Sequence, residues 1–151
     1  MRKIRVYLDN CCYNRPFDDQ KQIRVFLETQ AKFFIQRLIS DTKLDLAYSY
    51  MSVFENRNNR NKDNSRIIED FFVYAAFFVG PDQEQTVENR AKKIKTLGIK
   101  NKDAIHLACA IEAKCDYFIT TDDVILKRYV EKDIKVCSPI ELLTLEEVEN
   151  A

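Results

Sequence analysis

Hydrophobic and polar positions along the chain follow two different periods. Residues 4–8 (IRVYL) alternate in polarity and are rich in β-formers, which predicts a strand that ends at Asp9. The polar stretch 10–19, which contains Arg15-Pro16, is expected to be a loop. From 20 to 39, apolar residues recur at helical intervals, which predicts a long helix. The residues that set this period are Ile23, Phe26, Leu27, Ala31, Phe34, Ile35 and Leu38.

The next segment mixes one short strand with strongly helical patterns. Residues 44–47 predict a second strand, and Ser49 or Ser52 can cap a helix that carries Met51, Phe54 and Glu55. The polar stretch 55–66 either extends that helix into solvent or turns out of it. An apolar helix is predicted over 65–79, stopped by Gly80-Pro81.

In the last third of the chain, strands and helices alternate. Helices are predicted over 83–97, 102–114 and 122–131, strands over 116–120 and 134–137, and a helix or turn over 139–143. Short strands separated by helices long enough to cross over imply a parallel sheet with helices on both faces. A chain of 151 residues suits one domain, so residues 1–151 are expected to form a single unit.

Composition narrows the function classes. Hydrophobic residues make up 46% and charged residues 32%, as in globular proteins, and the longest apolar run, 71–79, is too short for a membrane span. No signal peptide is expected. The odd number of cysteines, five, with no CxxC pair, argues against a disulfide framework and favours a cytoplasmic protein. A net charge of zero disfavours coating of nucleic acid by bulk charge, so any such contact needs a local patch.

Acidic residues fall where the predicted strands end and helices begin. Asp9 ends the first strand, and Asp122 and Asp123 follow the strand at 116–120. Asp103 lies in the first turn of a helix, and Glu55 lies on the helix after the second strand. These positions share one edge of a parallel sheet. Bare carboxylates about 4 Å apart would repel by up to roughly 4 kcal/mol, which a divalent cation would relieve. Hard oxygen ligands suit Mg²⁺ or Mn²⁺.

Each of these acids also has a purely structural interpretation. The helix macrodipole favours Asp103 in a first turn, and Asp122 can cap the helix that follows it. Glu55 is one of many glutamates in the chain. Asp9 is harder to explain in this way, and the joint placement of the four supports a shared site.

Four segments together resemble the PIN-domain family. They are VYLDN at 6–10, SVFE at 52–55, KDAIHLACA at 102–110 and FITTDD at 118–123. Many small members of that family are ribonuclease toxins of VapBC-type toxin–antitoxin pairs. The resemblance implies an α/β, PIN-like three-layer fold, with a central parallel sheet of about four to five strands and helices on both faces. It also implies that the metal-site acids are Asp9, Glu55, Asp103 and Asp122, with Asp123 able to substitute or assist.

The function implied is cleavage of RNA phosphodiester bonds with Mg²⁺ or Mn²⁺ held by this cluster. Thr120 or Thr121 would fix the loop or a metal-bound water, and Asn10 and Arg15 would support substrate binding. Arg57 and Arg60 either contact phosphate or simply decorate a solvated segment. An antitoxin protein is an expected partner, and single-stranded RNA is the expected substrate.

Other functions fit the same residues. The domain is alternatively a catalytically weak PIN-like module that binds RNA or protein around a structural cation. A receiver-type domain with Asp9 as phosphate acceptor fits poorly, because no Lys follows Ile119. His106, the only histidine, is expected in the core or behind the site, since the sequence indicates no nucleophile for it. Cys11 and Cys12 have no basic neighbour in sequence to activate them.

Aromatic residues crowd the helix predicted over 65–79. They occupy more than one side of that helix, which predicts contact with a partner peptide or a second copy of the chain. The equally weighted alternative is a helix buried on all sides within a monomer. The aromatic residues concerned are Phe71, Phe72, Tyr74, Phe77 and Phe78.

Overall fold

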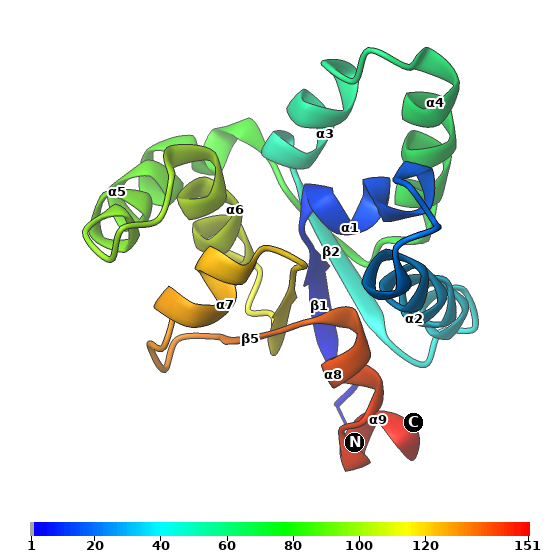
Figure 1. Cartoon of the computed structure of the whole chain (residues 1–151). Coiled ribbons are helices and arrows are strands. Elements are labelled where there is room, and N and C mark those ends of the chain that lie inside the picture. Colours follow the sequence, from blue (N-terminus) through cyan, green and yellow to red (C-terminus); the bar gives the residue numbers. More distant parts are fainter. Residues whose placement is uncertain (1) are drawn as a thin grey trace.

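The computed structural model describes residues 2–151 and is built on a five-stranded parallel sheet (Figure 1). The strand order is β3-β2-β1-β4-β5, and every neighbouring pair is parallel. The α/β class, the parallel sheet and the strand number are therefore as the sequence predicted. The strands are β1 (Arg5–Leu8), β2 (Asp45–Ser49), β3 (Phe77–Val79), β4 (Tyr117–Ile119) and β5 (Lys135–Cys137).

Helices cover both faces of the sheet, which gives three layers. In Figure 1, α5, α6 and α7 lie on one side of the sheet, and α2 and α8 lie on the other. Short 3₁₀ turns occur at Arg15–Phe17, Phe72–Tyr74 and Pro81–Gln83. The helices are α1 (Asn10–Asn14), α2 (Ile23–Ser40), α3 (Tyr50–Arg57), α4 (Lys62–Phe71), α5 (Glu84–Lys95), α6 (Asn101–Glu112), α7 (Asp123–Arg128), α8 (Pro139–Leu143) and α9 (Glu146–Glu149).

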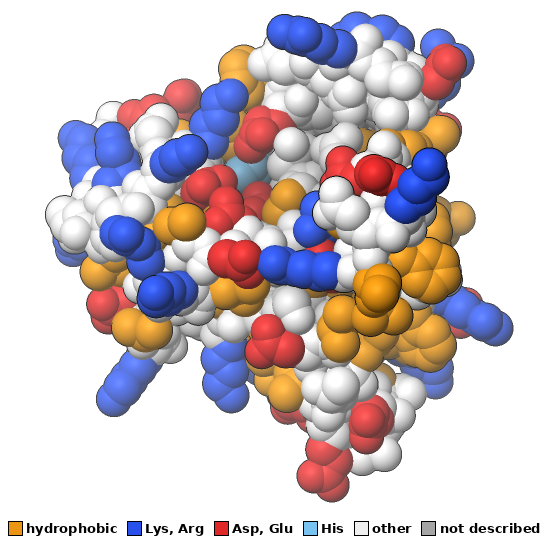
Figure 2. All heavy atoms as spheres, viewed as in Figure 1, with side chains coloured by type: hydrophobic (Ala, Val, Ile, Leu, Met, Phe, Trp, Pro, Cys, Tyr) orange, Lys and Arg blue, Asp and Glu red, His pale blue; other side chains and the backbone are white. Residues whose placement is uncertain are grey.

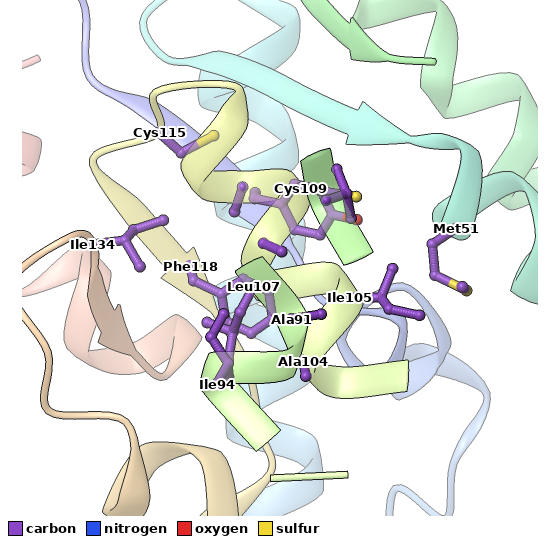
Figure 3. Close-up of a cluster of buried hydrophobic side chains, with 14 of the residues drawn as sticks. Met51, Ala91, Ile94, Ala104, Ile105, Leu107, Cys109, Cys115, Phe118 and Ile134 are labelled. Atoms are coloured by element: carbon purple, nitrogen blue, oxygen red, sulfur yellow. The ribbon is translucent and has the colours of Figure 1, made fainter. Parts of the chain in front are cut away.

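Two hydrophobic cores form because successive strand residues point to opposite faces. On β1, Tyr7 enters the core with α5 and α6, whereas Val6 and Leu8 enter the core with α2 and α8. Figure 3 shows part of the first core, where Ala91 and Ile94 of α5 pack with side chains of α6. Both faces of β1 are thus buried, as is usual for a parallel sheet.

The single helix predicted over 65–79 is wrong. Helix α4 ends at Phe71, a 3₁₀ turn follows, and Phe77–Val79 becomes edge strand β3. Aromatic and β-branched residues favour a strand, and the Ala76 amide donates to the carbonyl of Leu46, which aligns the segment beside β2. Gly80-Pro81 therefore ends a strand. The five aromatic residues do not share one helix, and Phe72 is buried while Tyr74 and Phe78 are half-exposed.

The loop predicted over 10–19 is also wrong in its first half. Asp9 caps the short helix α1 by accepting a hydrogen bond from the Asn10 amide. Pro16 then lies at the start of a 3₁₀ turn, where its missing N–H costs nothing. The chain therefore turns sharply at the end of β1 and keeps Asp9 at the edge of the sheet.

Helix α2 leaves five of its apolar residues on the solvent side, although Ala31 and Ile35 of the predicted helical period are buried. The residues facing inward include Glu28, Thr29 and Lys32, all buried. Arg15 donates to Glu28 at 2.6 Å, and Arg24 lies 3.4 Å from the same carboxylate, so the buried acid is paired. The apolar side chains left exposed on α2 are Ile23, Phe26, Leu27, Phe33 and Phe34.

Within residues 2–151, no helix combines the length and the apolarity that crossing a membrane requires.

Candidate active site

The acidic residues singled out in the sequence lie at the edge of the sheet where the strands end. Asp9 follows β1, and Asp122 caps α7 just beyond β4. Glu55 lies on α3, which begins directly after β2, and Asp103 lies in the first turn of α6. Figure 2 shows acidic side chains gathered around the single histidine, with basic side chains on the surface nearby.

Asp9 is held at both carboxylate oxygens. The Asn10 amide donates to Oδ1 at 2.8 Å, and the Thr120 hydroxyl donates to Oδ2 at 2.8 Å. The thiol of Cys11 also lies 3.4 Å from Oδ2. Thr120 accepts a hydrogen bond from the Asp122 amide, so one hydroxyl links the ends of β1 and β4. Asp9 is only 3% exposed, and these bonds replace the water that it loses.

Asp122 and Asp123 take different roles at the start of α7. Asp122 Oδ1 accepts from the amides of Val124 and Ile125, which leaves Oδ2 free of protein donors among the described residues. Asp123 instead forms a two-bond ion pair with Arg24 at 2.8 and 2.9 Å. This pairing turns Asp123 toward α2, so it is Asp122 that stays beside the other acids.

The pKa of Asp103 is affected by the charges of the other carboxylates. Burial raises its pKa from 3.8 to about 6, and the negative charges of Asp9, Asp122 and Glu55 add to the effect, against a smaller opposing effect of His106. Asp9, Asp122 and Glu55 are thus close enough to Asp103 for their charges to disfavour its ionised form. A cation bound among these carboxylates would offset their repulsion.

Glu55 is fixed by a buried chain of polar groups. Its carboxylate lies 2.5 Å from His106 Nε2, and His106 Nδ1 lies 2.6 Å from the Tyr7 hydroxyl. Burial works to raise the pKa of Glu55, but the hydrogen bond to His106 and the electrostatic effects of His106 and Lys102 outweigh it, so the pKa is lowered. His106 is 1% exposed, which agrees with the expected position in the core behind the site.

The remaining candidates lie beside the acids or away from them. Thr121 is buried, and its carbonyl accepts from Arg24. Arg15 is engaged with Glu28 and Asp18, so its guanidinium serves the structure of α2 rather than an open site. Cys12 is fully buried, which holds the pKa of its thiol well above the usual range and leaves it unreactive.

Three residues near the site were missed in the sequence. Arg24 ties α2 to the start of α7, but nothing in a helical pattern distinguishes it from other surface arginines. Tyr7 did carry a signal, because a tyrosine inside a buried strand needs a partner for its hydroxyl. Lys102, directly before Asp103, lies close enough to Glu55 to lower its pKa.

The donor chemistry of the site fits a hard divalent cation, although the ligand set is not assembled in advance. Carboxylate oxygens are the ligands that Mg²⁺ and Mn²⁺ prefer. Burial is the main cause of the raised pKa of Asp103, and the charges of Asp9 and Asp122, which add to it, are of the kind that such an ion would offset. Across residues 2–151, however, no group of three or more His, Cys, Asp or Glu side chains is already spaced to hold a metal ion. Binding would therefore have to draw the carboxylates together.

Comparison with known proteins identifies the fold. No family model matches the chain, and no curated protein matches it in sequence. Among solved structures, FitAcB from Neisseria gonorrhoeae matches with a TM-score of 0.58 at 17% identity, over 89% of this chain and 98% of that one. VapBC2 from Rickettsia felis, solved with a DNA fragment from its promoter, matches with a TM-score of 0.54 at 12% identity over the same shares. The likeness confirms the PIN-like fold that the sequence motifs implied.

Proposed function

We propose that this chain is a divalent-cation-dependent ribonuclease, acting as the toxin of a VapBC-type toxin–antitoxin pair. The proposal rests on the placement of Asp9, Glu55, Asp103 and Asp122 at the end of the sheet, where the charges of the other three add to burial in raising the pKa of Asp103. This placement occurs on the PIN-like fold shared with VapBC2 and FitAcB. Gathered carboxylates at the carboxyl ends of parallel strands suit chemistry on a phosphodiester that needs a cation.

In this proposal the acids divide the work. Asp9, Asp103 and Asp122 hold Mg²⁺ or Mn²⁺, and Glu55 contributes directly or through a water. The bound ion would supply a water of lowered pKa and balance charge on the phosphate. Thr120 keeps the Asp9 carboxylate oriented through its 2.8 Å hydrogen bond. His106 keeps the carboxylate of Glu55 in place on the opposite side.

The RNA backbone would be held by a local basic surface, because the chain has no net charge. The last turn of α5 carries Lys92, Lys93 and Lys95. Lys102 lies in the first turn of α6 beside Asp103, and its positive charge helps to lower the pKa of Glu55. A backbone phosphate approaching from α5 and α6 would thus meet lysines before it reaches the carboxylates.

A protein partner is proposed for the solvent side of α2. The exposed apolar residues of this helix form a stripe along one side of it, and Phe34 and Leu38 line a groove of about 390 Å³ with Leu143 and Val148. A surface of this kind usually marks a protein contact. An antitoxin is the partner that the proposed toxin role requires, and a second copy of the chain is the other occupant to test.

One observation favours a second candidate function. Because no three acidic side chains are pre-assembled as ligands within residues 2–151, the domain would also suit a weakly catalytic module that binds RNA or protein. Turnover of an RNA pool with Mn²⁺, beside an EDTA control, separates the two functions. Cleavage that needs Mn²⁺ supports the nuclease, and RNA binding without cleavage supports the module.

The central test replaces Asp9 with Asn. Asn can still accept from the Asn10 amide and can donate its NH2 to the Thr120 hydroxyl oxygen, so the metal-free protein should be about as stable as wild type. Cleavage should be abolished. Wild type should gain about 2.7 kcal/mol of stability at a hundredfold excess of Mn²⁺ over its Kd, whereas the variant should gain much less. Thermal melts with and without Mn²⁺, beside an RNA-cleavage assay, measure all three.

A matched control is Asp45→Asn, which makes the same chemical change at the start of β2, the opposite edge of the sheet. It should cleave RNA and respond to Mn²⁺ as wild type does. If Asp9→Asn cleaves RNA at the wild-type rate, the active site is elsewhere. If it melts several degrees lower without metal, Asp9 is a structural anchor.

A further inference from the structure

At the end of the sheet, three segments each provide one residue to the proposed site and a second residue to a buried cluster beneath it. Strand β1 provides Tyr7, and Asp9 directly follows the strand with its backbone still extended, so that the two residues, two positions apart, lie on the same side. Helix α6 provides Asp103 and His106, one turn apart on one side of the helix. In each pair, one residue is an acid of the proposed site and the other lies beneath it.

Helix α3 repeats this arrangement. Ser52 and Glu55 are again one turn apart, and Ser52 completes a capping box with Ser49 at the end of β2. Tyr7, Ser52 and His106 therefore come from the same segments as Asp9, Glu55 and Asp103. Together with Ser49 they form one buried cluster, which comprises Tyr7, Ser49, Ser52 and His106.

The cluster is connected by short hydrogen bonds. The Tyr7 hydroxyl lies 2.7 Å from Ser49 Oγ, 3.1 Å from Ser52 Oγ and 2.6 Å from His106 Nδ1. The ring of His106 then reaches Glu55 Oε1 through Nε2 at 2.5 Å. Tyr7 is fully buried and the other three members are at most 4% exposed, so water does not compete for these bonds.

One assignment of donors and acceptors satisfies the hydrogen bonds around His106 and Tyr7. A carboxylate only accepts, so Nε2–H of His106 donates to Glu55. With a neutral imidazole, Nδ1 accepts the proton of the Tyr7 hydroxyl, and the Tyr7 oxygen accepts from the serine hydroxyls. The Tyr7 hydroxyl thus fixes which ring nitrogen of His106 faces Glu55 with a proton.

We propose that Tyr7 and His106 are positioning residues that set the divalent-cation affinity of this site by holding the Glu55 carboxylate against it. The inference rests on the proposed nuclease function. A glutamate on a helix of eight residues has several rotamers, and ordering it only on binding would cost free energy. The His106 bond orders it beforehand, and Tyr7 keeps the imidazole from turning. Neither residue needs to touch the cation or the RNA.

The test measures Mn²⁺ affinity of the metal-stripped protein by calorimetric titration at pH 7.5, without RNA. Tyr7→Phe keeps the ring and removes the hydroxyl, and should weaken Mn²⁺ binding about tenfold. His106→Leu removes both ring nitrogens and should weaken it by about tenfold to a hundredfold. His106→Gln retains a donor toward Glu55 and should recover part of that loss. Circular dichroism confirms that each variant is folded before titration.

The matched control is Tyr13→Phe. Tyr13 is as buried as Tyr7, but its hydroxyl has no hydrogen-bond partner among the described residues, and it packs in the opposite core. Removing this hydroxyl should leave Mn²⁺ affinity unchanged. A general effect of losing a buried tyrosine hydroxyl would weaken binding in both variants and would contradict the proposal.

A double-mutant cycle shows whether Tyr7 acts through Glu55. In a Glu55→Gln background, adding Tyr7→Phe should change Mn²⁺ affinity little, because the group that Tyr7 holds has lost its charge. An equal loss in both backgrounds, or wild-type affinity in Tyr7→Phe and His106→Leu, overturns the inference. If those variants also cleave RNA normally, the nuclease proposal still stands. Absence of Mn²⁺ binding and cleavage in wild type would instead refute the nuclease proposal and this inference with it.

Discussion

Asp103 is the carboxyl whose protonation is most affected by its neighbours. Its pKa rises from 3.8 to about 6, through burial and the charges of Asp9 and Asp122. A raised pKa means that the folded state binds this proton more tightly than the unfolded state. The resulting stability is fully present below about pH 4 and is lost as the pH rises through about 6.

The metal-free protein should therefore lose stability between pH 4 and 6 through this group, by on the order of 1 kcal/mol after screening by solvent is allowed for. Asp103→Asn cannot titrate, so its unfolding free energy should change less over that window. Urea denaturation of both proteins in EDTA, at several pH values, measures the difference. If the unfolding free energies of the two proteins changed equally with pH, the pKa of Asp103 would not be raised by folding.

At the scale of residues, sequence position identified the acids more readily than the groups that hold them. Asp9 and Asp122 lie just beyond the predicted strands, and the end of a strand can be recognised where its pattern of apolar residues stops. Thr120 was placed near the site for the same reason, but its bond to Asp9 joins residues 111 apart in the chain. The Tyr7 contact with His106 spans 99 residues. Partners of that kind depend on strand order, which local patterns do not determine.

Helix α2 is the element whose sequence pattern is most at odds with its packing. Its inward side carries Glu28, 2% exposed, and this acid must be paired to be buried. Arg15 is the principal partner, at 2.6 Å and largely shielded, and Arg24 is a half-exposed partner at 3.4 Å. The two arginines therefore allow a comparison of a shielded ion pair with an exposed one.

Arg15→Met should lower the unfolding free energy by about 3 kcal/mol, because it leaves a buried carboxylate with only a weak partner. Arg24→Met, which keeps the hydrocarbon stem in the same way, should cost about 1 kcal/mol or less. Chemical denaturation measures both. Equal losses would contradict this ranking and would mean that the bonds of Arg24 to Glu28, Asp123 and Thr121 together stabilise the fold as much as Arg15 does.

The longest segment that the sequence misjudged lies between β2 and α5. The run 65–79 was predicted as one helix because its apolar residues are dense and Gly80-Pro81 looks like a helix stop. Phe77–Val79 becomes a strand because β2 has an open edge that the Ala76 and Phe77 backbone can join. Tertiary pairing thus overrides a local pattern that is compatible with both structures. Long helices such as α6, with an apolar side and clear ends, were predicted to within two residues.

At the scale of the molecule, the order of the strands brings the site together. Strand β1 lies at the centre, with β2 on one side and β4 on the other. All three strands therefore end at the same edge of the sheet, and the segments that follow them begin there. Asp9, the helix that carries Glu55, and Asp122 follow those strands directly. A parallel sheet could be predicted from alternating strands and helices, and this is why the acids could be grouped before their contacts were known.

The outer surface of α2 gives a prediction for the molecule as a whole. Its five exposed apolar side chains leave on the order of 500 Å² of apolar surface, at the upper end for a protein that works alone. Without a partner to cover this surface, the purified chain should associate with itself as its concentration rises. Glutamate at Leu27 and Phe34 places charge in the stripe while keeping good helix formers, so Leu27→Glu/Phe34→Glu should sediment as a monomer.

The melting temperature of that double variant should stay within a few degrees of wild type, because both side chains are about half-exposed already. The control is Val130→Glu, which removes an even more exposed apolar side chain outside α2 and should leave association unchanged. Sedimentation velocity at several concentrations compares the three proteins. A wild type that remains monomeric throughout would show that α2 does not join copies of the chain. Equal association in wild type and the double variant would place the contact on another surface.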